Sequence, residues 1–237
     1  MLQTFLTRSA CLVFSLCVSC VLFAQTPVVR GAATLTEKTY PASNFHRIDL
    51  EDINGRVVVE SGKSYQVLFE VNDNLIDYFQ AVEYGGVLTV SKVAPGGRMP
   101  YLEGLRLTIH IRLPRLDSVR LHGNAQLQVL GIDGDAFVLQ ASGNCAVQLE
   151  GRVASLVVDH KGNGDVDARD VKAQHARIVT AGNGDVFISS SDSFEASLSG
   201  NGNVRNYGKG RAKVVAREGN GKVLGLQALS AQGRVDR

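Results

Sequence analysis

Three aspartates that follow Gly-Asn pairs are the residues whose type and spacing first suggest chemistry. Asp165 and Asp167 lie in the segment "GNGDVDA", and Asp185 takes the place of Asp165 in the next copy, "GNGDVFI". Glycine- and aspartate-rich repeats bind calcium in β-rolls, where carboxylate oxygens are the ligands. The other copies here have unlike residues at this position: Gln126, Ala146, Asn203 and Lys222. We therefore expect solvated carboxylates, with calcium binding by these three aspartates as the alternative that the sequence leaves open.

Carboxylates and basic residues on one lateral face would also suit the cleavage of polysaccharides. The candidates for such a face are Lys161, Asp165, Asp167, Asp170 and Asp185. A glycan-active enzyme, similar to a lyase or a hydrolase, would need its carboxylates to converge in a groove. The support is otherwise only fold analogy and ordinary surface charge. We expect a protein that is not an enzyme and has no catalytic residues, and keep the glycan-active enzyme as the alternative.

Cysteine and histidine give no further site. Three of the four cysteines, Cys11, Cys17 and Cys20, lie in the first 24 residues. Cys145 has no base beside it in the sequence, so we expect a small corner residue and not a nucleophile. The five histidines have no metal-ligand spacing: His46, His110, His122, His160 and His175. The sequence predicts no cofactor and no metal site, and the histidines are expected to be structural or solvated.

The elements that would position these residues come from an internal repeat. The dipeptide Gly-Asn recurs six times, in steps of 20, 19, 20, 18 and 19 residues. The pairs are Gly123 and Asn124, Gly143 and Asn144, Gly162 and Asn163, Gly182 and Asn183, Gly200 and Asn201, and Gly219 and Asn220. We expect these twelve residues to form a structural column at one corner of a stacked fold, because stacked asparagines hydrogen-bond along such an axis.

Apolar residues flank every pair at constant distances. Four residues after each glycine stand Leu127, Val147, Val166, Val186, Val204 and Val223, and four residues before it stand Val119, Leu139, Val158, Ile178, Ala196 and Val215. Between these columns apolar and polar residues mostly alternate, which is typical of strands. Two short strands around a Gly-Asn corner, repeated every 19 residues, predict a right-handed parallel β-helix. An antiparallel sandwich with Gly-Asn hairpins is the competing interpretation, but hairpins do not require a constant period.

The pattern of residues 34–113, before the repeats, predicts strands that are less regular than those of the repeats. The segment "DINGRVVVESG" resembles a degenerate coil with Asn54 and Gly55 at its corner, and "NLIDYFQAV", residues 74–82, is the one plausible short helix or irregular turn. The segment 93–104, rich in Gly and Pro, predicts a mobile loop. Residues 226–237, with Arg234, Asp236 and Arg237, are expected to protect the C-terminal strand edge.

The first 24 residues have the features of an export signal, with one basic residue, an apolar stretch and the small residue Ala24 before Gln25. We expect cleavage after Ala24, with lipid attachment at Cys20 as the alternative. The rest of the chain holds 24 basic and 23 acidic residues, since Arg8 is removed from the 25 and 23 of the full sequence. This near balance excludes an electrostatic case for nucleic acid, and no later segment has the apolar length of a membrane span.

Several features together resemble a known family. They are the Gly-Asn-Gly corners and their spacing, the pattern "F..I.L..I.G.V.V..G" from Phe45 to Gly62, and "IRLPRLDSVRLHGNAQL" before the repeats. The chain is similar, over about residues 43–228, to the putative autotransporter adhesin head domain, or head GIN domain, of Bacteroidetes-type exported proteins. The resemblance implies a pectate-lyase-like right-handed β-helix without an established active site, and a role in adhesion.

The sequence thus predicts a signal peptide (1–24), an N-terminal extension (25–42) and a single β-helix domain (43–237), with the regular repeats at about 114–228. We expect a non-enzymatic protein, secreted to the periplasm, the outer membrane or the cell surface. Its expected partner is a cell-surface glycan or an envelope protein. Association of identical chains through strand edges is left open.

Overall fold

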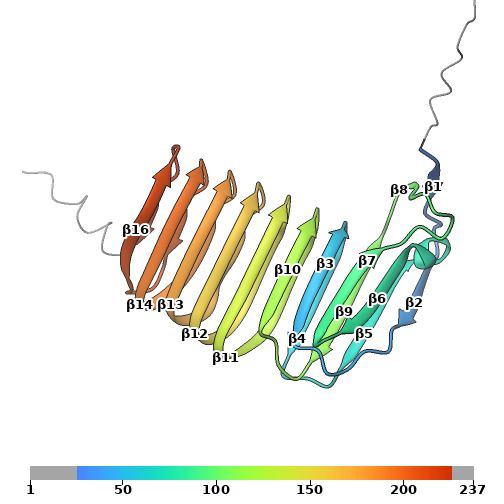
Figure 1. The fold of residues 1–237 in the computed structure, drawn as a ribbon, viewed down its shortest axis with the longest axis horizontal. Coiled ribbons are helices and arrows are strands. Elements are labelled where there is room, and N and C mark those ends of the chain that lie inside the picture. Colours follow the sequence, from blue (N-terminus) through green and yellow to red (C-terminus); the bar gives the residue numbers. More distant parts are fainter. Residues whose placement is uncertain (1–25, 226–237) are drawn as a thin grey trace, which may run out of the picture.

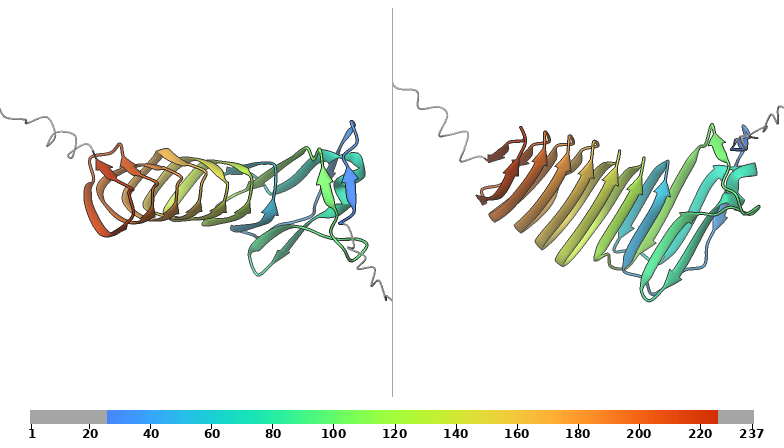
Figure 2. Two further views of the ribbon diagram at one scale, coloured as in Figure 1. Left: turned by 90° about the horizontal axis from the view of Figure 1, so that it is seen from above. Right: turned by 45° about the horizontal axis from the view of Figure 1, so that its top comes forward.

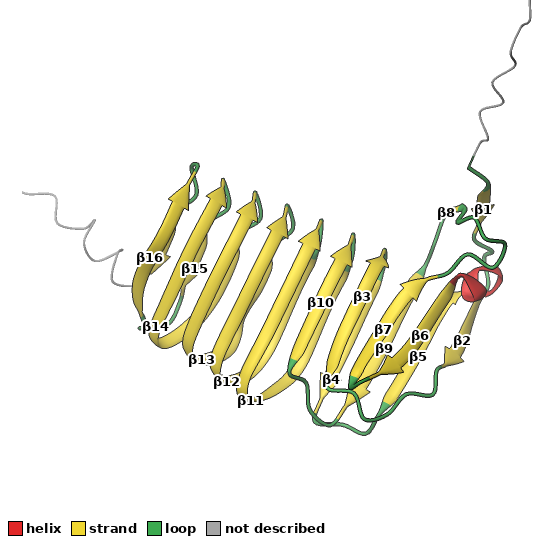
Figure 3. Ribbon diagram, viewed as in Figure 1, coloured by secondary structure: helices red, strands yellow, loops and turns green. Residues whose placement is uncertain are grey.

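The chain folds into an elongated β-solenoid. The computed structural model describes residues 26–225, and in these residues strands dominate and the only helix is the 3-10 helix η1, Asp73–Tyr78 (Figures 1 and 3). Four long strands form the regular coils, each paired in parallel with the next: β11 (Gln126–Gly143), β12 (Ala146–Gly162), β13 (Val166–Gly182) and β14 (Val186–Gly200). The prediction of an all-β parallel solenoid is confirmed.

Each coil contributes to two sheets that meet at the Gly-Asn corner. The post-corner sheet contains the first halves of β11 to β14 and continues into β15 (Val204–Asn206) and β17 (Val223–Gly225). The pre-corner sheet contains their second halves, flanked by β10 (Ser118–Gly123) and β16 (Arg211–Glu218). Figure 2 shows these coils stacked along one axis, so that equivalent residues of successive coils lie in rows.

One further coil precedes the regular ones. β3 (Arg47–Ile53) pairs with β10, and β4 (Arg56–Ser61) pairs with β11, so the predicted degenerate coil with Asn54 and Gly55 at its corner is confirmed. The chain then crosses to the other side of this coil. There β7 (Val87–Lys92) pairs with β3, and β9 (Leu107–Leu113) pairs with β4. Residues 47–61 therefore lie between two parts of the chain that come later in the sequence.

Antiparallel strands close the N-terminal end. β5 (Gln66–Asn72) pairs with β9 and with the edge strand β2 (Leu35–Thr39), while β6 (Phe79–Tyr84) forms a hairpin with β7. The helix predicted at residues 74–82 ends at Tyr78, because the following residues pair with β7. The predicted loop at 93–104 contains the strand β8 (Tyr101–Glu103), which pairs with β1 (Val28–Arg30). Pairing with the next strand in a hairpin decided the first segment, and pairing with the distant strand β1 decided the second.

Apolar side chains fill the interior in vertical columns. One column contains Leu127, Val147, Val166, Val186 and Val204, all buried. Another contains Phe137, Leu156, Ala176 and Phe194, in which a small residue lies between larger ones. Each fully buried large side chain contributes about 1.5–3 kcal/mol through the hydrophobic effect. These columns explain why the sequence alternates on both sides of every corner.

The last coil departs from the predicted columns. The sequence pattern places Val215 in the interior, but Val214 pairs with Ala196 and Val215 is 58% exposed. A register shift after Ala196 moves Val215 out of the column. Every residue of β16 is exposed, and one of its edges is not paired with any described strand. The segment expected to protect this edge, residues 226–237, lies outside the described residues, as do the predicted signal and Cys20.

No helix among residues 26–225 has the length and apolar character needed to cross a membrane.

Candidate functional site

Glycine is required at the corners for two different reasons. The first glycine of each repeat has a positive φ, for example 132° at Gly182, which side-chain-bearing residues rarely adopt. The second glycine has no such φ but touches the coil below it. A Cβ on Gly184 would lie 2.0 Å from the backbone oxygen of Gly164, which is closer than any real contact. The close approach of successive coils therefore favours glycine at the second position of the last four corners, whereas Ala125 and Cys145 stand there in the first two.

The asparagines between these glycines are joined by side-chain hydrogen bonds along the axis. Each amide nitrogen donates to the Oδ1 atom of the preceding coil: Asn163 to Asn144 (2.9 Å), Asn183 to Asn163 (2.8 Å), Asn201 to Asn183 (2.8 Å) and Asn220 to Asn201 (3.0 Å). At Asn124 the contact to the preceding coil is made by the backbone, whose N–H donates to the Ile53 oxygen at 3.1 Å. The asparagines are exposed on the outside of the corner.

Of the three aspartates of the calcium hypothesis, Asp167 lies on the post-corner sheet, and Asp165 and Asp185 directly precede its strands β13 and β14. Asp165 Oδ1 accepts the backbone N–H of Asp185 at 2.8 Å, and Asp185 Oδ1 accepts the backbone N–H of Asn203 at 2.8 Å. These carboxylates thus bond to the backbone of the next coil. Asp167 instead pairs with Arg169. In the part of the chain that the structure describes, no group of three or more His, Cys, Asp or Glu side chains could hold a metal ion.

The residues considered for polysaccharide cleavage are not brought together in one groove. Lys161 lies on the pre-corner sheet, where its Nζ atom is 3.3 Å from Asp159. Asp167 lies on the other sheet, across the corner, and Asp165 and Asp185 directly precede strands of that sheet. Asp170 is exposed in the first half of β13, in register with Glu150. None of the buried polar side chains within residues 26–225 is an aspartate or a glutamate.

Cys145 and His160 are both buried. The Cys145 thiol lies 3.3 Å from the backbone oxygens of Gly123 and Ser142, and burial raises its pKa, so the reactive thiolate is disfavoured. His160 lies in an interior row with Ala141 and Thr180. Neither ring nitrogen has a hydrogen-bond partner among the described residues, and burial lowers the pKa of the imidazole. The other four histidines are not buried.

An aromatic and arginine cluster on the post-corner sheet was not found from the sequence. The Arg169 guanidinium donates from Nε and Nη2 to both oxygens of Asp167, at 2.9 and 2.5 Å, and this lowers the pKa of Asp167. The same guanidinium lies 5.4 Å from the ring centre of Phe187 and 5.6 Å from that of Tyr207. The sequence does hold a signal for this cluster, because Arg169, Phe187 and Tyr207 follow the post-corner valines of three successive repeats within three residues.

An open cavity lies beside this cluster, at the edge where each coil turns from the post-corner sheet back to the pre-corner sheet. Its volume is about 800 Å³, and its lining includes Asp133, Asp135, Arg152, Lys172, Tyr207 and Lys209. We call it the edge groove. No sequence motif indicates this edge, because the turns here have different lengths and share no common residues.

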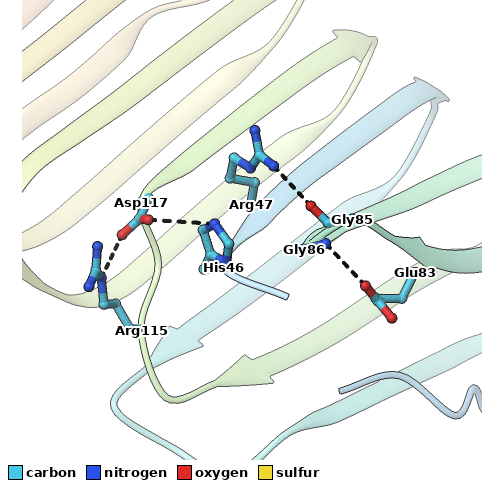
Figure 4. Close-up of polar contacts among 7 residues, drawn as sticks. All are labelled: His46, Arg47, Glu83, Gly85, Gly86, Arg115 and Asp117. Carbon is cyan, nitrogen blue, oxygen red and sulfur yellow. Dashed lines mark hydrogen bonds and ion pairs between the residues drawn. The ribbon is translucent and has the colours of Figure 1, made fainter. Parts of the chain in front are cut away.

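A second polar cluster holds the N-terminal hairpin to the first coil (Figure 4). Arg47 donates to the Gly85 backbone oxygen at 3.0 Å, and His46 Nε2 lies 3.9 Å from Asp117, which also accepts from Arg115 at 2.7 Å. The contacts join β3, the turn between β6 and β7, and the segment before β10. This cluster is best explained as a structural junction, since its groups bond to one another.

Comparisons with known proteins support the same fold. A family model described as "Putative auto-transporter adhesin, head GIN domain" matches residues 44–210. A solved putative adhesin from Bacteroides fragilis is 19% identical, with a TM-score of 0.63, and the match covers 84% of this chain and all of that one. A putative adhesin from Parabacteroides merdae is 21% identical, with a TM-score of 0.52. That match covers 85% of this chain and all of the other chain.

A putative lipid binding protein from Parabacteroides distasonis is 15% identical, with a TM-score of 0.54 over 84% of this chain and 99% of that one. No curated protein matches the sequence. At these identities the solved structures establish the fold alone.

Proposed function

The chain belongs to the head GIN domain family of putative auto-transporter adhesins, and from this premise we propose that it is an exported, non-enzymatic module that binds cell-surface or cell-envelope material. The proposed ligand is a glycan or an envelope protein that lies along the outside of the solenoid.

One observation carries this proposal: the outer side of the post-corner sheet presents a straight row of side chains, one from each coil. The row contains Gln128, Gln148, Asp167, Phe187 and Arg205, which are in register across five successive coils. Parallel strands place such residues about 4.8 Å apart. A rigid row of amide, charged and aromatic groups suits an extended polymer, because many weak contacts can be made without ordering a loop.

The enzyme alternative receives less support from the geometry. Acid and base catalysis of glycan cleavage needs two carboxyl groups on either side of a bound sugar. Asp165 and Asp185 bond to the backbone of neighbouring coils, and Asp167 is paired with Arg169. The name of the Parabacteroides lipid binding protein suggests a further ligand, but the interior here is filled by side chains, so a lipid would have to bind outside.

Binding of the purified chain to isolated envelope polysaccharides and to whole cells tests the proposal. We expect binding that weakens at least threefold in the variant Gln148→Ala with Phe187→Ala, because both side chains project from the row. The matched control is Thr89→Ala on the N-terminal strand β7. Cleavage of a polysaccharide by the purified chain, or no binding to any envelope fraction, would overturn the proposal.

Export is tested separately by mass spectrometry of the protein made with its own signal. Cleavage after Ala24 would leave Gln25 as the first residue, whereas lipidation would leave an acylated Cys20. A chain that retains its first 24 residues in the cytoplasm would exclude export.

A further inference from the structure

The edge groove combines a cavity with cations that have no carboxylate partner. Arg152 and Lys172 are in register on neighbouring coils, and Lys209 lines the same cavity from the last turn. Within residues 26–225, none of the three lies within ion-pair distance of an acidic side chain, whereas Arg169, Arg177 and Lys213 do. Like charges opposite each other on adjacent strands destabilise a sheet. An anion bound between them would remove that cost.

The acidic groups near the groove do not neutralise these cations directly. Asp133 and Asp135 line its other end, where Asp133 is in register with Arg152. Glu150 and Asp170 stand two residues before Arg152 and Lys172, and they are in register with each other. The groove is therefore positive at the end formed by Lys172 and Lys209 and acidic at the other end. A ligand fits this arrangement if its carboxylate lies at the positive end and its hydroxyl groups lie at the acidic end.

Tyr207 supplies a rigid aromatic wall at the positive end. The turn that carries Tyr207 and Lys209 is fixed by the buried side chain of Asn206. Asn206 Oδ1 accepts the N–H groups of Ser190 (2.8 Å) and Gly208 (3.0 Å), and Nδ2 donates to the backbone oxygens of Ser190 and Gly210. The Tyr207 N–H also donates to the Ile188 oxygen at 2.8 Å. All four hydrogen-bonding positions of this amide are used, so the turn is held in place.

Arg169 orients the Tyr207 ring from the side of the post-corner sheet, since its guanidinium lies near the rings of Tyr207 and Phe187. Tyr207 remains 47% exposed. An exposed aromatic ring held by its neighbours can stack against the apolar face of a sugar ring with little loss of side-chain entropy. The groove therefore offers a stacking surface next to two cations.

We propose that the edge groove binds an acidic oligosaccharide, with a uronic acid ring on Tyr207 and its carboxylate between Lys172 and Lys209. The inference deepens the proposed function and rests on it, because it names the class of glycan and a place on the solenoid. Arg152 contacts the next sugar or its carboxylate, and Asp133 and Asp135 accept hydrogen bonds from hydroxyl groups.

Titration calorimetry with oligogalacturonate tests the proposal on the full exported chain. We expect binding that falls about tenfold on full methyl esterification of the probe, because the ester keeps the ring and removes the charge. Affinity should also fall as NaCl rises from about 0.05 M to about 0.5 M. Inorganic sulfate at the same concentration should not compete, because it has no ring to stack on Tyr207.

Two variants distinguish the stacking contact of Tyr207 from the charge contacts of the lysines. Tyr207→Ala should weaken binding of the acidic and esterified probes alike, by about fivefold. Lys172→Gln with Lys209→Gln should weaken binding of the acidic probe alone. The controls are Tyr84→Ala, whose ring is 87% exposed at the far end of the molecule, and Lys63→Gln. Circular dichroism verifies that each variant is folded.

Three results would each overturn the acidic-glycan proposal. The first is equal binding of the acidic and esterified probes, and the second is unchanged binding in both groove variants. The third is an affinity for single-stranded DNA of matched charge that equals the affinity for the acidic probe. Binding of neutral envelope glycans that depends on Gln148 and Phe187 but not on the groove would refute this inference and leave the proposed function standing.

Discussion

The amide nitrogen of Asn183 donates to Oδ1 of Asn163 at 2.8 Å, across two successive coils of the solenoid. Oδ1 of Asn183 in turn accepts from Asn201 at 2.8 Å, so an interior asparagine makes one bond upward and one downward. Asn220, in the last repeat, donates to Asn201 at 3.0 Å and has no described coil above it. The number of side-chain hydrogen bonds that an asparagine makes therefore depends on its position along the solenoid axis.

This difference predicts unequal stability losses. Asn183→Ala removes two side-chain bonds and leaves two neighbouring amides short of a partner, whereas Asn220→Ala removes one bond. Because the column is exposed, we expect each bond to contribute only about 0.5–1 kcal/mol, so Asn183→Ala should cost about twice as much as Asn220→Ala. Urea denaturation of the two variants measures this. Equal losses, or no loss for either, would mean that each asparagine serves its own corner and that the stacked column contributes nothing.

The corner glycines predict a larger effect. Gly184→Ala places a methyl group where only 2.0 Å separates it from the Gly164 oxygen, so the coils must move apart, at a cost of about 3 kcal/mol or more. Gly96→Ala is the matched control, since a Cβ there meets nothing within 4 Å, and it should be neutral or slightly stabilising. Denaturant midpoints compare the two. A Gly184→Ala protein as stable as Gly96→Ala would show that the coils do not approach as closely as described.

The coil architecture was predictable because the Gly-Asn period and the apolar columns are local patterns that repeat. The position of residues 66–113 was not, since β7 and β9 return to β3 and β4 by pairing over a long sequence distance. Nor could the pattern reveal the register shift that exposes Val215, which depends on one extra residue in β16. The edge groove was missed for a related reason: Lys172 and Lys209 line the same cavity from turns of unequal length, so no fixed spacing in the sequence relates them.

The buried His160 predicts a loss of stability in mild acid. Burial lowers its pKa from the ordinary value of 6.5, partly offset by the carboxylates of Asp165 and Asp159. The unfolded chain therefore binds a proton more readily than the folded one. The stability held above about pH 6.5 is lost as the pH falls below that value. His160→Leu should remove this part of the pH dependence, so the variant should lose less stability than the wild-type chain between about pH 6.5 and about pH 5.

Urea denaturation at a series of pH values measures the effect of His160→Leu, with the exposed His175→Leu as the matched control. If both variants and the wild-type chain lose stability in parallel below pH 6.5, the imidazole of His160 does not set the acid sensitivity.

Thr180 stacks next to His160 and is also without a partner for its hydroxyl group among the described residues. Thr180→Val keeps the shape of the side chain and removes the buried unsatisfied group, so we expect the free energy of unfolding to rise by about 1 kcal/mol. Ser142→Ala is the contrasting change, because its hydroxyl lies 2.9 Å from His122 Nδ1 and would lose that contact. A Thr180→Val protein less stable than wild type in thermal melts would indicate that the hydroxyl group has a partner in solution.

The last prediction concerns the C-terminal strand edge. β16 pairs with β14 on one side, and Val214 and Val215 are 50% and 58% exposed. An exposed apolar edge strand is a template for pairing with another chain. If residues 226–237 protect this edge, deleting them should promote self-association in the full-length background, and adding Val215→Lys to the deletion should reverse it, because a charge on an edge opposes pairing. Light scattering at several protein concentrations measures both, with Val82→Lys on β6 as a control for a general gain in solubility. A truncated chain as monodisperse as the intact one would show that the twelve residues do not protect the edge. If Val82→Lys reverses the self-association as well as Val215→Lys does, β16 is not the strand through which the chains associate.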